Sequence, residues 1–484
     1  VMRKKFTANL IFLFAANLLV KPFWIFGIDR VVQNRVGAEI YGTYFAVFNY
    51  SFLLAIILDF GINNFNNRAV SRNHKRSGEY LSNLLLLKFF LAIIYFAFTY
   101  LTALSTGYSK LQMKMLLLLA VNQILLSVIL YLRSNLAALQ FFKTDSIISV
   151  LDRFLTIVFC LVLLYISAFK ENFNIEWFIY AQTLSLFFTA IIALLLVLCK
   201  SKPRIHLWKL KFTKLILLKS FPFALLALLM GIYYRIDAVM IERMLPNGAH
   251  EAGIYAASFR LLDALNMFGY LFATLLLPMF AGMIRRKESI NDLVKFSAEL
   301  MLVMSVTAGI SCYFFRNEIM HLLYRESNLY WAEIFGWLML NFIPMSSVYI
   351  FGTLLTAKGS LKILNFIALG GMILNVGLNL FLIPHYGALG ATIATLTTQF
   401  FVAAIHIYAA NQQFRFQYKT NDLIKISSFT FICIVALFII KLLLPLNWMF
   451  DFVLAVSACL VAAVLTKLIP LHQIYALLKD KAAS

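Results

Sequence analysis

The chain has 484 residues, of which 62% are hydrophobic and 13% charged, and its mean hydropathy is +0.85. A soluble domain of this size needs far more polar surface, so these values exclude a soluble enzyme or binding module. The net charge of +21 does not indicate a nucleic-acid binder, because the basic residues form short clusters between apolar runs, as cytoplasmic loops of membrane proteins do.

Apolar runs of roughly 18 residues or more recur along the whole chain, and they predict an all-α polytopic membrane protein of about fourteen transmembrane helices. The runs are rich in Leu, Phe and Ala, whereas a transmembrane β-barrel would show alternating segments of about 10 residues. The predicted helices cover residues 6–28, 40–62, 81–103, 113–133, 146–168, 176–199, 216–242, 251–283, 293–315, 331–355, 361–383, 386–410, 422–443 and 449–470.

The charges of the predicted loops alternate along the chain. With the N-terminus in the cytoplasm, 26 basic residues fall on the cytoplasmic side and nine on the other, where acidic residues are comparable in number. This asymmetry predicts an even number of helices and two cytoplasmic termini. No loop is long enough to fold as a domain, so the protein must act within its helices, and we expect neither an enzyme nor a nucleic-acid partner.

A short pattern, Gly-x-Tyr-x-Ala after an acidic residue, occurs at Gly42 and again at Gly253, 211 residues later. Because this offset spans six helices, it predicts two parallel repeats. We therefore expect two pseudo-symmetric six-helix lobes around a central cavity. The expected divisions are an N-terminal lobe at 1–205, a C-terminal lobe at 206–415, and two additional helices with a cytoplasmic tail at 416–484.

Ionisable and polar residues inside the predicted helices are candidates for a translocation site, because such residues are costly in a membrane. The repeat aligns Arg260 with Asn49, and Lys88 with Glu299. The candidate residues are Lys21, Asn49, Lys88, Arg153, Arg235, Asp237, Arg260 and Asp263. Their surplus of cations suits an anionic substrate such as a pyrophosphate. The alternative is internal charge pairing that only holds helices together; for Arg153, beside Asp152, we favour such a local pair.

The cysteines and histidines are scattered, with no spacing typical of a metal or redox site. We expect no catalytic residues, no metal and no bound cofactor.

Three stretches of the sequence carry a family resemblance. The first is RVGAEIYGTY at 35–44 with LDFG at 58–61, and the second is YRID at 234–237 with GIYAASFRL at 253–261. The third is LNVGLNLFLIPHYGALGATIAT at 374–395. Together they resemble the polysaccharide transporter family, the O-antigen-type lipid-linked oligosaccharide flippases of the multidrug/oligosaccharidyl-lipid/polysaccharide (MOP) flippase superfamily.

The resemblance implies alternating access in the bacterial inner membrane. The substrate would be an undecaprenyl-pyrophosphate-linked repeat unit of O-antigen, capsule or exopolysaccharide, moved from the cytoplasmic to the outer leaflet. Cavity cations that bind the pyrophosphate map onto Lys21, Arg235 and Arg260. Membrane lipids and the polysaccharide polymerase machinery are the implied partners. The resemblance also implies coupling to a proton or sodium gradient or to the membrane potential, and no residue set in the sequence fixes the ion.

Three other functions are open to test. A multidrug exporter of the same superfamily handles cationic drugs and would show an excess of cavity acids. A flippase for another lipid-linked cell-wall precursor would differ only in the head group that it moves. A membrane polymerase or ligase would need a large outer loop, and the predicted topology has none.

Overall fold

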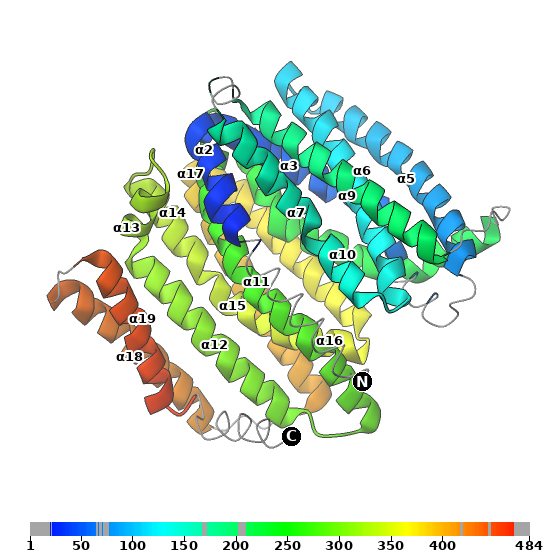
Figure 1. Cartoon of the computed structure of the whole chain (residues 1–484). Helices are drawn as coiled ribbons and strands as arrows, with labels where there is room; N and C mark the ends of the chain where they lie inside the picture. The colour runs from blue at the N-terminus through cyan, green and yellow to red at the C-terminus, as the bar shows by residue number, and fades with distance from the viewer. Residues whose placement is uncertain are drawn as a thin grey trace. The chain divides into compact units, whose positions relative to one another are not determined.

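A computed structural model describes residues 22–63, 77–166, 173–201, 210–416, 420–443 and 447–468, together with residues 20, 66, 70 and 171. Regular structure in these residues is entirely helical (Figure 1). Twelve helical segments of the described residues are long and apolar enough to cross a membrane. The chain is therefore a multi-pass membrane protein, and the predicted fold class is confirmed.

The chain divides into two compact units, Val1–Ala256 and Ala257–Ser484, with the boundary inside helix α11. In the first unit, α6 packs against α3, α5, α7 and α9, and α3 packs against α10 (Figure 1). The described helices of this unit, up to the one that crosses the boundary, are η1 (Trp24–Asp29), α2 (Arg30–Val36), α3 (Ala38–Leu54), η2 (Ala55–Leu58), α5 (Ser77–Ser105), α6 (Lys110–Ala138), α7 (Phe142–Tyr165), α9 (Ile175–Ser201), α10 (Leu210–Met244) and α11 (Gly248–Arg286).

In the second unit, α12 packs against α14 and α15, and α18 and α19 pack against each other and against α12 (Figure 1). An apolar core that includes Val306, Phe429 and Ala462 joins these last three helices. The remaining described helices are α12 (Asn291–Phe314), α13 (Arg316–Leu323), α14 (Leu329–Leu340), α15 (Phe342–Ser347), η4 (Val348–Gly352), α16 (Thr353–Lys358), α17 (Leu361–Phe414), α18 (Thr420–Leu443) and α19 (Trp448–Leu465).

Each predicted helix from the second to the last has a counterpart in these elements. The first, 6–28, lies mostly outside the described residues. The predicted helix 331–355 is interrupted: it comprises α14, α15, the π-helical turn η4 and α16. The predicted lobes, 1–205 and 206–415, stay a prediction, because they rest on the sequence repeat and not on the packing units.

Helix α17 is two helices joined at a kink. Its 54 residues would extend about 80 Å as one straight helix, far beyond a ~30 Å hydrocarbon core. The break is at Gly387, whose φ of 60° and ψ of −139° are not helical, and Pro384 lies one turn earlier. Because a side chain rarely adopts this backbone conformation, glycine is required at the kink. The kink separates the predicted helices 361–383 and 386–410.

The start of α3 and the start of α11 pack backbone to backbone within the first unit. A Cβ atom on Gly42 would lie 1.9 Å from the carbonyl oxygen of Ala249, and one on Gly253 would lie 2.0 Å from that of Ala38. Both pairs are related by the 211-residue offset of the predicted repeat. The contact is therefore reciprocal, like a two-fold interface, and it resembles small-xxx-small helix packing in membranes.

Large apolar side chains cover the outer surface of the helices. Phe366, Phe381 and Phe431 expose 75%, 68% and 68% of their surface. Exposed apolar area on this scale is unfavourable in water and favourable in lipid. The surface therefore agrees with the membrane assignment made from hydropathy.

Candidate functional site

The site begins where the second predicted transmembrane helix breaks. Helix α3 tightens into the 3-10 turn η2, and the chain then leaves helical geometry at Phe60 (φ 40°) and Gly61 (φ 75°). A carbonyl group at such a break must find another hydrogen-bond donor, because there is no water in the hydrocarbon region. The carbonyl oxygen of Leu58 accepts hydrogen bonds from Lys88 Nζ at 2.9 Å and from Ser127 Oγ at 3.2 Å.

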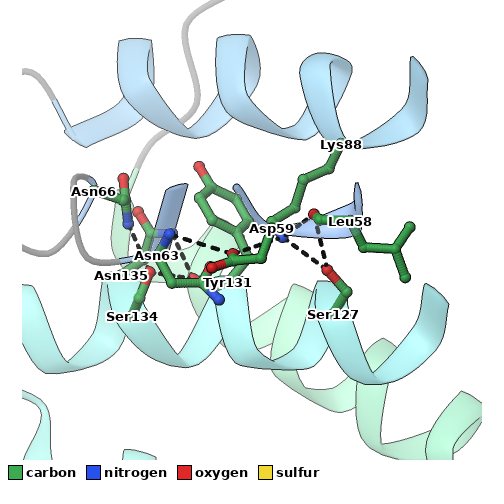
Figure 2. Close-up of polar contacts among 9 residues, drawn as sticks. All are labelled: Leu58, Asp59, Asn63, Asn66, Lys88, Ser127, Tyr131, Ser134 and Asn135. Atoms are coloured by element: carbon green, nitrogen blue, oxygen red, sulfur yellow. Dashed lines mark hydrogen bonds and ion pairs between the residues drawn. The ribbon is translucent and has the colours of Figure 1, made fainter. Parts of the chain in front are cut away.

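Lys88 reaches this break from the middle of α5. Its ammonium donates to three oxygen atoms: Leu58 O at 2.9 Å, Ser127 Oγ at 2.8 Å and Asp59 Oδ1 at 3.3 Å (Figure 2). Lys88 is only 3% exposed. A buried ammonium is tolerated when its charge is paired and its three N–H groups are bonded. Both conditions are met here.

A pocket of about 310 Å³ lies beside Asp59, inside the first unit. The Asp59 side chain is 31% exposed. The same carboxylate therefore pairs with the buried Lys88 and lines the pocket. Four polar side chains and a majority of apolar ones form the wall. The lining residues are Phe52, Leu53, Ala55, Ile56, Leu58, Asp59, Asn63, Gln123, Leu126, Ser127, Leu130, Ala227, Leu228 and Gly231.

Arg235 lies next to this pocket, one helical turn beyond Gly231 on α10. Its guanidinium carbon is 5.6 Å from the centroid of the Phe52 ring, which lines the pocket, and 5.2 Å from that of Tyr234. Aromatic faces attract a guanidinium and hold its plane. The pocket therefore has a cation beside one wall and the Asp59–Lys88 pair in another.

A polar network continues from Lys88 along α6. Tyr131, whose ring centroid is 5.8 Å from Lys88 Nζ, donates its hydroxyl to the carbonyl of Leu81 at 3.3 Å. Asn135 Nδ2 donates to the Tyr131 carbonyl at 3.0 Å, and Asn66 Nδ2 donates to Ser134 Oγ at 2.8 Å (Figure 2). The Tyr131 bond joins α6 to α5, and the Asn66 bond joins α6 to the chain after the break.

The other predicted site residues of the first unit do not line the pocket. Asn49 is 1% exposed and donates to Phe45 O at 2.8 Å. Asp237 is equally buried and accepts from the Tyr255 hydroxyl at 2.7 Å. Arg153 lies on α7, with its guanidinium carbon 5.3 Å from the Trp24 ring centroid and its Nε 3.7 Å from Asp152 Oδ2. These residues take part in packing and local pairing.

The remaining predicted residues fall elsewhere. Arg260 and Asp263 are half-buried on α11 in the second unit. Lys21 lies outside the described residues. The second unit has a pocket of its own, about 320 Å³ in volume, lined by Glu299, Lys295 and Asp422 among others. Lys295 Nζ lies 2.7 Å from Asp422 Oδ1 and 3.9 Å from Glu299 Oε1.

Sequence reasoning did not pair Lys88 with its partner. The 211-residue repeat placed Lys88 and Glu299 at equivalent positions and named no partner for either residue. The structure pairs Lys88 with Asp59 in the same unit. Ser127, Gln123 and Asn63 were missed as well. A usable signal was present in LDFG at 58–61, because a glycine and an acid within an apolar segment indicate a helix break that needs a donor.

A second group of polar contacts ties the other end of α10 to the first turn of α6 and to the loop before it. Gln112 Nε2 donates to Glu242 Oε1 at 2.6 Å. Arg243 Nε lies 2.9 Å from Glu242 Oε2, and its guanidinium carbon is 3.9 Å from the Tyr108 ring centroid. Burial raises the pKa of the Tyr108 phenol above its ordinary value, against the opposing influence of Arg243. Tyr108 therefore acts here as a neutral ring that stacks on a cation.

In the part of the chain that the structure describes, no group of three or more His, Cys, Asp or Glu side chains is arranged to hold a metal ion.

The comparisons with known proteins agree with this architecture. A family model described as "Polysaccharide biosynthesis protein" matches residues 6–284, more than half of the chain. This chain belongs to that family. The match covers the whole of the pocket and the Asp59–Lys88 pair.

Three relatives and neighbours extend the comparison. The lipid III flippase of Escherichia coli is 25% identical over 179 residues, which cover 36% of this chain and 43% of that protein. The match therefore spans less than half of either chain.

A solved structure of the lipid II flippase MurJ in an inward closed conformation is 14% identical with a TM-score of 0.69, and the alignment covers 97% of this chain and 98% of that one. An inward-facing multidrug resistance MATE transporter of the MOP superfamily is 15% identical with a TM-score of 0.65, over 84% and 98% of the two chains. At these identities the structures show the fold alone, and this chain has a fold like those of MurJ and the MATE transporter.

Proposed function

We propose that this protein is a flippase for lipid-linked oligosaccharides, which moves an undecaprenyl-pyrophosphate-linked repeat unit of O-antigen, capsule or exopolysaccharide from the cytoplasmic to the outer leaflet. Membership of the polysaccharide biosynthesis family and similarity to a lipid III flippase support a lipid-linked substrate. The observation that carries the proposal is the pocket of the first unit, where an arginine lies beside a mainly apolar wall that includes four hydrogen-bonding side chains.

The chemistry of the pocket suits the head group of such a lipid. Arg235 provides a guanidinium that can bind two phosphate oxygens at once. Asp59, Asn63, Gln123 and Ser127 provide acceptors and donors for sugar hydroxyls. A volume of about 310 Å³ is at the small end of ligand pockets, roughly 300–1,000 Å³. The pocket can therefore receive one sugar or one phosphate group, while the polyprenyl tail stays in lipid.

Transport would proceed by alternating access, and no step forms or breaks a covalent bond. In this proposal the protein is a transporter and not an enzyme, it acts in the bacterial inner membrane with both termini in the cytoplasm, and a polysaccharide polymerase would receive its product. A proton or sodium gradient or the membrane potential would drive net movement.

The proposal is tested by glycan export in a bacterium that lacks its own flippase and expresses the full chain. Wild type should restore export, whereas Arg235→Ala and Arg260→Ala should not, at equal membrane levels. Arg286→Ala is the matched control, because Arg286 is an exposed residue paired only with Glu288 among the contacts of the described chain. Normal export by both Arg235→Ala and Arg260→Ala would contradict the cationic path.

Two other substrate classes are outcomes of the same experiment. Failure of wild type to restore any of several glycans, together with resistance to cationic drugs, would show a multidrug exporter. Restored growth of a strain depleted of a flippase for another cell-wall precursor would show a different lipid-linked head group. The pocket favours the oligosaccharide, because its one exposed carboxylate is already paired with Lys88.

A further inference from the structure

The Lys88 ammonium occupies a position with the chemistry of a cation site. Its three neighbours are a backbone carbonyl, a carboxylate and a hydroxyl, all contributed through oxygen, at 2.9, 3.3 and 2.8 Å. The carbonyl comes from a break in a transmembrane helix. In membrane transporters, unwound backbone and the C-terminal ends of half-helices are the groups that coordinate small cations such as sodium.

We propose that this is a small-cation site that Lys88 fills permanently with its own tethered ammonium, so that the first unit needs no free ion there. Removal of the Lys88 side-chain charge and bulk would open the site to sodium. The Asp59 carboxylate would then require a new cation. Without one, a negative charge and the Leu58 carbonyl would both lose the partner that Lys88 supplies, in a region of low dielectric constant where unpaired polar groups are costly.

Three features favour a cation site over an ordinary structural lysine. The ammonium lies between α5, α6 and the helix break, and the residue is 3% exposed, so the charge does not snorkel to an interface. Ser127 Oγ is within 3.2 Å of Leu58 O as well as 2.8 Å of Lys88 Nζ, so two of the oxygens already converge without the lysine. Asp59 is also open to the pocket, which provides a route for an ion to enter.

The test measures how sodium changes the thermal midpoint of the purified full-length protein in detergent. Each variant is compared in sodium chloride and in choline chloride at equal ionic strength. Sodium should raise the thermal midpoint of Lys88→Ala more than that of wild type, by on the order of 2 °C or more. Adding Asp59→Asn to Lys88→Ala should abolish that extra gain, because the site then loses its charge.

Lys88→Met is the matched control, since it lacks the charge, keeps most of the stem and ends in a methyl group that offers an ion no oxygen ligand. It should show the same sodium response as wild type. If Lys88→Ala does not fold in choline, Lys88→Gln is measured in its place, because its shorter side chain ends in an oxygen that can join the other three. A sodium gain in either variant that Asp59→Asn removes supports the proposal.

An absence of extra sodium gain in both variants overturns it, and so does failure of both to fold even in sodium. The readout is thermal stability, so it does not depend on which substrate the protein moves. A negative result here would leave the proposed flippase function standing, and a negative export result would leave the cation site standing.

Discussion

Gly42 on α3 and Gly253 on α11 each lie where a methyl group would collide with the backbone of the other helix. The two glycines are 211 residues apart, and Gln33 Nε2 adds a hydrogen bond of 2.9 Å to the carbonyl of Gly253. Helices in lipid gain most from packing when small residues let their backbones approach. This reciprocal contact joins α3 to the part of α11 that belongs to the first unit.

Gly42→Ala should therefore loosen the contact between α3 and α11. The added Cβ would lie 1.9 Å from Ala249 O, and such overpacking costs about 1–3 kcal/mol. A fall in the thermal midpoint of the purified protein is the expected result. Gly370→Ala is the control, because its Cβ would meet only a side chain at an ordinary 3.5 Å. Equal midpoints for the two variants would show that the helices can separate without cost.

The Asp59–Lys88 pair should behave as one unit in a double-mutant cycle. Removing one partner of a buried pair costs roughly 3 kcal/mol, because the other charge is left uncompensated. Asp59→Asn and Lys88→Met should each lower the thermal midpoint. The fall in the double variant should be much smaller than the sum of the falls in the two single variants. Additive losses would mean that the 3.3 Å contact contributes nothing to stability.

Glycan export should depend on the guanidinium group of Arg235 and not only on its positive charge. Lysine keeps the charge, but it lacks the planar group that stacks on Phe52 and Tyr234 and cannot bind phosphate through two parallel bonds. We expect Arg235→Lys to reduce glycan export several-fold and Arg235→Ala to reduce it by about tenfold or more, since a hydrogen bond to a charged group contributes about 1.5–3 kcal/mol. Export by the lysine variant at the wild-type rate would reduce the role of Arg235 to that of a point charge.

Gly387 should be intolerant of a side chain. Its φ of 60° and ψ of −139° lie where residues with a Cβ are strained by about 1–3 kcal/mol. Gly387→Ala should lower the yield of folded protein from membranes. Gly377→Ala in the same helix is the control, because a Cβ there would meet nothing within 4 Å and alanine favours a helix. The opposite ranking of the two yields would argue against the kink.

The helices were the predictable part of this protein, because hydropathy alone marks segments that must cross a bilayer. The repeat at Gly42 and Gly253 was also readable, since both glycines carry the same local pattern. Pairing of Asp59 with Lys88 was not, because it depends on how two helices lie side by side. The proline at 344 signals the break between α14 and α15, whereas hydropathy stays high across the π-helical turn η4 and does not mark it.

The most direct test of the central claim is transbilayer movement of a fluorescent undecaprenyl-pyrophosphate-linked oligosaccharide in liposomes that contain the purified full-length protein. We predict that wild type and Arg286→Ala accelerate movement over protein-free liposomes, and that Arg235→Ala does so at least about tenfold less. Movement at the protein-free rate with wild type, or equal rates with wild type and Arg235→Ala, would contradict the account.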